Sequence, residues 1–108
     1  MADEIEYSVP EGVSSFEDCV FPEGVTHIFA HNRNIKNFEG LSCLKSLRYL
    51  NCSRNQITSF EGFPCLERLE ELICYNNQIT SFEGLPRLKN LTYLYFFING
   101  TSHIDIHL

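Results

Sequence analysis

Histidine and cysteine side chains stand at spacings in this chain that first suggest metal binding or nucleophilic catalysis. His27 and His31 would face the same way on one strand, but four residues at about 3.3 Å each place them roughly 13 Å apart, too far to share a metal ion. Cys52 and Cys74 are expected inside the fold, away from these histidines, which removes a Cys–His nucleophile pair. We therefore expect no metal site and no catalytic residue.

Two further sets of reactive side chains recur at a fixed spacing of 22 residues. Cys43 with Cys65, and Cys52 with Cys74, fit either a metal or disulfide function or small apolar fillers in a repeated slot. No Cys-x-x-Cys occurs, so we expect reduced fillers. A column of glutamates suggests either a cation site or a solvated rim near the start of each convex turn, and we favour the rim: Glu17, Glu39, Glu61 and Glu83.

Sequence motifs for other chemistry are missing as well. The chain has no glycine-rich phosphate loop, no Gly-x-Ser-x-Gly and no His-Glu-x-x-His. We therefore expect a protein that is not an enzyme and that uses no cofactor.

A 22-residue repeat organises the chain, because residues 47–68 and 69–90 are nearly the same sequence and 25–46 is a more divergent copy. A fixed repeat of this length predicts stacked units, each of which buries its apolar side against its neighbours. We expect one domain, residues 1–108. Its parts are a cap and partial repeat at 1–24, full repeats at 25–46, 47–68 and 69–90, and a last partial repeat with a tail at 91–108.

Each copy begins with a strand pattern, in which Leu50 and Cys52 alternate with Tyr49, Asn51 and Ser53. We predict parallel strands at 26–31, 48–53, 70–75 and 92–97, about 4.8 Å apart. The N-terminal segment also alternates, through Ile5, Tyr7 and Val9, but its phase is one residue off the repeat. It is predicted to be an atypical capping strand or a hairpin that comes first in the stack.

Polar and aromatic columns follow each strand. An asparagine whose amide satisfies buried backbone groups recurs at Asn55, Asn77 and Asn99, while Arg33 fills this slot in the first repeat and suggests a solvated or distorted turn. A spine of stacked rings is predicted from Phe16, Phe38, Phe60 and Phe82. Glycines are expected at positive φ, and prolines are expected to start a short 3₁₀ or helical turn: Gly40, Gly62, Gly84, Pro64 and Pro86.

The combined pattern, L-x-x-L-x-x-L-x-C-x-x-N-x-I-x-x-F-E-G-L, resembles the 22-residue class of leucine-rich repeats, as in a protein phosphatase regulatory subunit. The resemblance covers about residues 13 to 99 and implies an α/β solenoid. It would be a right-handed superhelix with a parallel sheet on the concave side and short 3₁₀ or helical turns on the convex side. The near-identical copies are also similar to the homogeneous repeat arrays of large DNA viruses of amoebae or of protists.

Outward residues of the predicted strands are not needed for the fold, so their composition indicates function. Many are aromatic, which favours a protein-binding surface, although strand propensity and ring contacts within the sheet explain the same residues. We predict a partner-binding set on the concave face: His27, Phe29, His31, Tyr49, Asn51, Ile73, Tyr75, Tyr93, Tyr95 and Phe97.

Charge and hydropathy limit the partner. A net charge of −6 and a pI near 5.1 argue against nucleic acid, which requires clustered Lys and Arg. No apolar run of about 18 residues could span a bilayer, and residues 1–12 do not resemble a signal peptide, so we expect an intracellular protein away from membranes. The first alternative to partner binding is self-association through the C-terminal end strand at 92–97. The second is phosphatase regulation, by analogy with the family alone.

Overall fold

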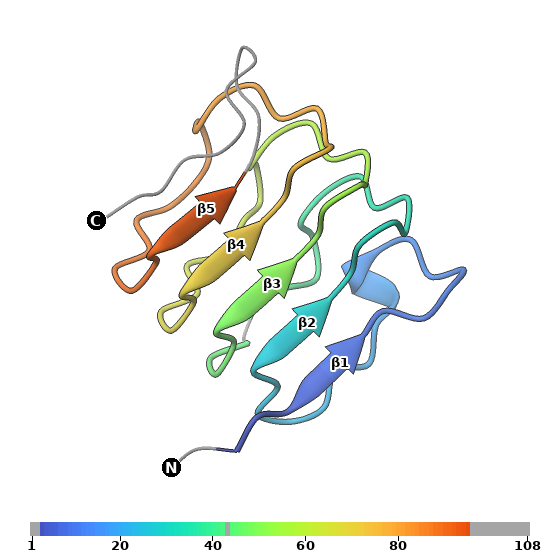
Figure 1. The fold of residues 1–108 in the computed structure, drawn as a ribbon, viewed down its shortest axis with the longest axis vertical. Helices are drawn as coiled ribbons and strands as arrows, with labels where there is room; N and C mark the ends of the chain where they lie inside the picture. The colour runs from blue at the N-terminus through green and yellow to red at the C-terminus, as the bar shows by residue number, and fades with distance from the viewer. Residues whose placement is uncertain (1–2, 43, 96–108) are drawn as a thin grey trace.

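The computed structural model describes residues 3–42 and 44–95. They form one parallel sheet of five short strands, stacked in chain order from the N-terminal end (Figure 1). The strands are β1 (Glu6–Ser8), β2 (His27–Phe29), β3 (Tyr49–Asn51), β4 (Glu71–Ile73) and β5 (Tyr93–Tyr95). The parallel solenoid predicted from the repeat is confirmed, with strands shorter than the alternation suggested.

The register of the sheet follows the repeat. Ile28, Leu50, Leu72 and Leu94 align across β2 to β5 and are fully buried. Strand β1 pairs in parallel with β2, and Tyr7 lies opposite Ile28. The sequence separation between these paired residues is one residue shorter than between the paired residues of the later strands. The predicted shift in phase and the first place in the stack are therefore confirmed, and a hairpin is excluded because the pairing is parallel.

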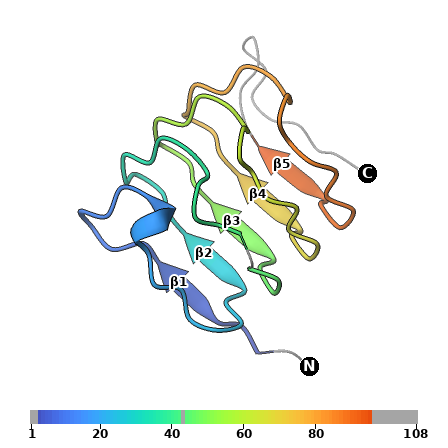
Figure 2. The ribbon, with the colours of Figure 1, turned by 180° about the vertical axis from the view of Figure 1, so that it is seen from behind.

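The convex side contains almost no helix. In the described ranges the only helix is the 3₁₀ turn η1 (Phe16–Asp18), and the remaining coils return behind the sheet as extended chain and turns (Figure 2). The short turns predicted after Pro64 and Pro86 are present only as single hydrogen-bonded turns, from Leu69 N–H to the Leu66 carbonyl at 3.2 Å and from Leu91 N–H to the Leu88 carbonyl at 3.0 Å, and neither is extended into a helix. The N–H of Phe63 bonds to the Phe60 carbonyl at 2.9 Å and closes one turn. Pro64 then lacks the N–H that would extend this turn into a helix.

Glycine is required where neighbouring coils approach each other. Gly40 has a φ of +102°, and a Cβ at this position would lie 2.5 Å from the backbone nitrogen of Glu17. Gly62 and Gly84 also have positive φ, as predicted.

The phenylalanine column is buried in three coils and partly exposed in the fourth. Phe16, Phe38 and Phe60 are buried, and the rings of Phe38 and Phe60 stack with centroids 5.9 Å apart. Phe63 adds an edge contact to Phe38 at 4.8 Å. Phe82 is 41% exposed, so its predicted burial is wrong.

The amide of Asn55 satisfies the backbone of two coils at once. Its Oδ1 accepts the N–H groups of Arg33 and Ile35, both at 2.9 Å. Its Nδ2 donates to the carbonyls of Ala30 at 2.9 Å and Cys52 at 2.8 Å. Because these groups lie beside the core, the amide takes the place of the water that they would otherwise need.

The next column position repeats this arrangement. Asn77 accepts the N–H of Ile57 at 2.9 Å and donates to the carbonyls of Cys52 and Cys74, both at 3.0 Å. The third member, Asn99, lies outside the described residues. Successive coils are thus held in one register by the same side-chain group.

Arg33 performs part of this role in the first repeat. Its Nε donates to the carbonyl of Val9 at 2.9 Å, as the asparagine amides do to the preceding coil. The turn is distorted at Asn34, whose φ of +60° has no counterpart at Gln56 or Gln78, as expected. The guanidinium thus replaces the amide donor in this slot.

Replacing Asn55 by Leu is expected to destabilise the fold by about 2 kcal/mol or more, since it leaves several buried backbone groups without partners. The free energy of unfolding from urea titration measures the effect. Gln78→Leu at an exposed position is the matched control and should change little. Equal stability of the two variants would contradict a structural role for the Asn55 amide.

Candidate functional site

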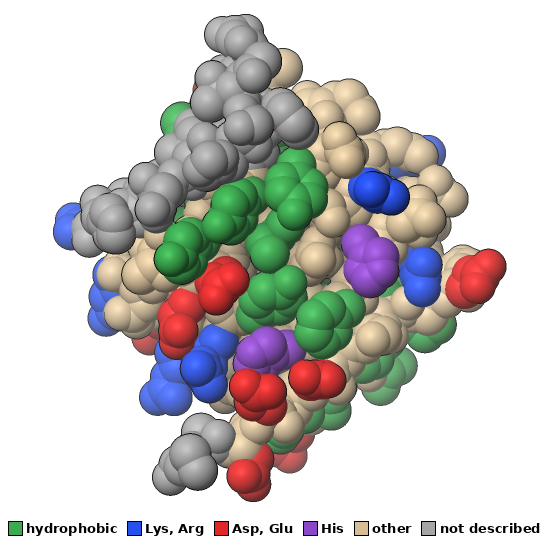
Figure 3. Space-filling view, viewed as in Figure 1, with side chains coloured by type: hydrophobic (Ala, Val, Ile, Leu, Met, Phe, Trp, Pro, Cys, Tyr) green, Lys and Arg blue, Asp and Glu red, His purple; other side chains and the backbone are tan. Residues whose placement is uncertain are grey.

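The outward side chains of the five strands form one surface, here called the sheet face. Figure 3 shows hydrophobic side chains in a band across it. Tyr75 and Tyr93 are 38% and 42% exposed, whereas most of the other members are half-buried. The predicted partner-binding residues that the structure describes are His27, Phe29, His31, Tyr49, Asn51, Ile73, Tyr75, Tyr93 and Tyr95, and they lie on or next to these strands; the predicted member Phe97 lies outside the described residues.

Aromatic rings on the sheet face gather at its C-terminal end around Tyr95. Tyr93 and Tyr95 stack with centroids 5.9 Å apart and planes within 2°. Tyr75 meets Tyr95 edge-on at 6.1 Å. These contacts hold the rings in fixed positions while Tyr75 and Tyr93 remain open to solvent.

A second group of rings lies on β2 and β3. Tyr49 stacks on His27 at 5.6 Å and lies against Phe29 at 5.5 Å. Burial raises the pKa of the Tyr49 hydroxyl above its ordinary value. This group is more deeply covered than the tyrosines at the C-terminal end, so its rings also stabilise the sheet.

Polar groups between the two ring clusters are engaged with one another. The Oδ1 of Asn51 accepts the backbone N–H of Ser53 at 3.1 Å and its hydroxyl at 2.8 Å. Ser53 is buried, so its predicted outward position is wrong. Its hydroxyl donates to the Asn51 amide oxygen, and the Asn51 side chain itself is half-buried.

The histidines and cysteines do not assemble into a reactive site in the described ranges. No group of three or more His, Cys, Asp or Glu side chains there could hold a metal ion. Thr26 Oγ1 lies 2.8 Å from the His27 Nδ1. Cys52 and Cys74 are buried, as predicted, and burial raises the pKa of the Cys52 thiol. Cys65 is exposed, so its predicted filler role is wrong, and Cys43 lies outside the described residues.

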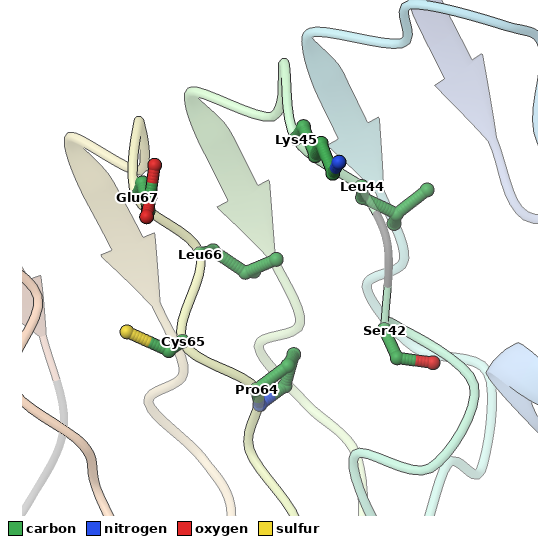
Figure 4. A pocket seen from close by; sticks show the side chains of 7 residues that line it. All are labelled: Ser42, Leu44, Lys45, Pro64, Cys65, Leu66 and Glu67. Carbon is green, nitrogen blue, oxygen red and sulfur yellow. The ribbon is translucent and has the colours of Figure 1, made fainter.

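Cys65 is exposed because the convex chain turns its side chain away from the core. A hollow of about 430 Å³ lies on the convex side. Among the side chains that line it, Leu66 and Cys65 point to opposite sides of their segment (Figure 4). Leu66 is buried, and the Cys65 thiol donates a weak hydrogen bond to the Arg87 carbonyl at 3.6 Å.

Comparison with known protein families identifies the architecture. The family model described as Leucine Rich repeats (2 copies) matches residues 24–65 and 67–107, most of the chain. The chain belongs to the leucine-rich repeat family. No curated protein and no solved structure gives a significant match to the chain.

Membership of the leucine-rich repeat family indicates the general role of this fold. Leucine-rich repeats generally mediate protein–protein interaction, and the family is typically a non-enzymatic scaffold. Among the described residues, no helix is both long and apolar enough to cross a lipid bilayer. The 22-residue class and the likeness to viral or protist arrays stay predictions.

The thiols are expected to differ sharply in reactivity. In a Cys43→Ser background, iodoacetamide should modify Cys65 at least about a hundredfold faster than Cys52 or Cys74, because the buried thiols react only after local opening. Mass spectrometry of digested samples follows each site over time. Equal rates at Cys65 and Cys74 would contradict the described packing, and urea should abolish the difference.

Proposed function

We propose that this protein binds another protein through the aromatic C-terminal part of the sheet face. The observation that carries the proposal is the exposure of Tyr75 and Tyr93 beside the half-buried Tyr95. Tyrosine is enriched among the residues that dominate binding energies at protein interfaces, since its ring buries a large area with few rotatable bonds.

The contacts between rings within the sheet support a binding function, and they also account for part of the aromatic content as structural packing. Tyr93 and Tyr95 are stacked before any partner arrives, so binding would cost little side-chain entropy. A purely structural role requires only that the rings cover each other and the sheet. Tyr75 and Tyr93 also expose ring surface that covers neither another ring nor the sheet, which favours a binding role.

The partner should be neutral to basic where it meets this surface. Glu71 lies on β4 in direct register with Tyr93 and contributes a carboxylate beside the tyrosines. A partner with an apolar or aromatic centre and a nearby Lys or Arg would match both features. We also propose that the protein acts without enzymatic activity and that it is intracellular.

Two earlier alternatives have less support. Self-association through the C-terminal end involves the predicted strand at 92–97, of which the structure describes only the part up to Tyr95, and the solution mass tests it directly. Phosphatase regulation rests on the family analogy alone, and no described residue favours it.

The triple substitution Tyr75→Ser, Tyr93→Ser and Tyr95→Ser is expected to reduce the affinity for a selected protein partner by about a hundredfold or more, since it removes the central rings. Partners are first selected against the wild-type protein from a displayed library that contains neutral and basic scaffolds. Affinity is then measured by calorimetry with each purified partner.

Folding and surface specificity need separate controls. The double variant Tyr75→Ser with Tyr93→Ser leaves the half-buried Tyr95 in place and should lose most of the affinity with an unchanged circular dichroism spectrum. Phe82→Ser, which removes an exposed ring behind the sheet, should bind as the wild type does. If both tyrosine variants fold and keep wild-type affinity for every selected partner, the proposal is wrong.

A further inference from the structure

The N-terminal edge of the sheet offers unpaired backbone groups. Strand β1 pairs through alternate residues, as shown by the bond from the His27 N–H to the Ile5 carbonyl and from the Val9 N–H to the Phe29 carbonyl. Glu6 and Ser8 lie between these positions, so their N–H and C=O groups point away from β2. In the described chain β2 is the only strand beside β1, and this edge can therefore accept a further strand.

The side of the first coil next to this edge is incompletely covered. The Tyr7 ring meets Phe21 edge-on at 5.0 Å, and the Tyr7 hydroxyl interacts with Cys19 and the backbone of Val20. Val20 is 86% exposed, the most exposed large hydrophobic side chain among the described residues. Tyr7, Cys19 and Phe21 are only partly buried, unlike the aligned leucines of the inner coils.

Charge is concentrated at the same end. Residues 1–24 contain seven Asp and Glu and no Lys or Arg, whereas all eight Lys and Arg come later in the chain. Figure 3 shows carboxylates gathered around the N-terminal edge, at the bottom of the view. Glu6 lies on the outer face of β1, in register with His27, and Glu4 approaches the His27 Nε2 at 3.8 Å.

We propose that this N-terminal edge binds an extended basic segment of another protein, which joins the sheet as a strand beside β1. Backbone hydrogen bonds to Glu6 and Ser8 supply the pairing. An apolar residue of the segment lies next to Tyr7 and covers the Tyr7–Val20–Phe21 side. Lys or Arg residues on either side of it lie next to the outward Glu6 and Ser8 and meet the carboxylates.

The acidic edge favours this occupant over a second copy of the chain. Two such edges would bring like charges together, which opposes pairing between copies. The strand at the other end of the described sheet, β5, carries no Lys or Arg and does not complement the edge. The surface is separate from Tyr93 and Tyr95 on β5, which lie four strands away, so the two proposals can fail independently.

The test uses a short blocked peptide of alternating lysine and valine and the same peptide with N-methyl groups on all of its backbone amides. In low salt, the unmodified peptide should saturate the full-length protein and shift the NMR resonances of Glu6, Ser8 and Val20. The N-methylated peptide should bind about tenfold or more weakly, because it keeps the charge and loses the backbone donors.

Variants of the protein separate pairing from charge. Ser8→Pro removes one outward N–H and should weaken binding about tenfold. Glu6→Gln should weaken it more than the control Glu61→Gln, an exposed glutamate on a later coil. Equal binding of the two peptides, shifts centred on Tyr93, or no saturation at millimolar peptide would each overturn the proposal. The peptide comparison decides the matter even if Ser8→Pro fails to fold.

Discussion

The structure depends on one constraint, which is that no coil can bury its apolar side without a neighbour in the same register. Each coil contributes a three-residue strand and a few inward side chains, so Leu50 is covered only because Ile28 and Leu72 align with it. The asparagine amides reinforce this register, since Asn55 and Asn77 bond to the backbone of their own and the preceding coil. Stability in such an array is a sum of nearest-neighbour terms.

The same constraint explains why the ends differ from the middle. Phe38 and Phe60 in the inner coils are fully buried, whereas Phe82 in the 69–90 repeat is partly exposed. In the described chain the first coil has a neighbouring coil on one side, and Tyr7 and Val20 are accessible. The N-terminal end also differs in sequence. Residues 1–24 are rich in Asp and Glu, and Arg33 stands at the position that Asn55 and Asn77 occupy in the later coils.

The surface available for recognition follows from what the fold leaves unused. Strand positions alternate strictly, so every inward leucine implies an outward neighbour that packing does not dictate. In this protein many of those neighbours are aromatic, and their mutual contacts arrange them before binding. The family relationship supports protein recognition in general, and the identity of the rings rather than the family points to the C-terminal part of the sheet face.

Repetition let the sequence alone determine the parallel sheet, its stacking order, the phase shift of β1, the positive φ of Gly40 and the inward cysteines, because a residue at one coil predicts its equivalents. Only the tertiary structure decided the places where equivalents diverge. Phe82, Cys65 and Ser53 occupy repeated slots, yet the first two are exposed and the third is buried. Their burial depends on which atoms of other coils and neighbouring residues surround them, and a one-dimensional pattern does not contain that information.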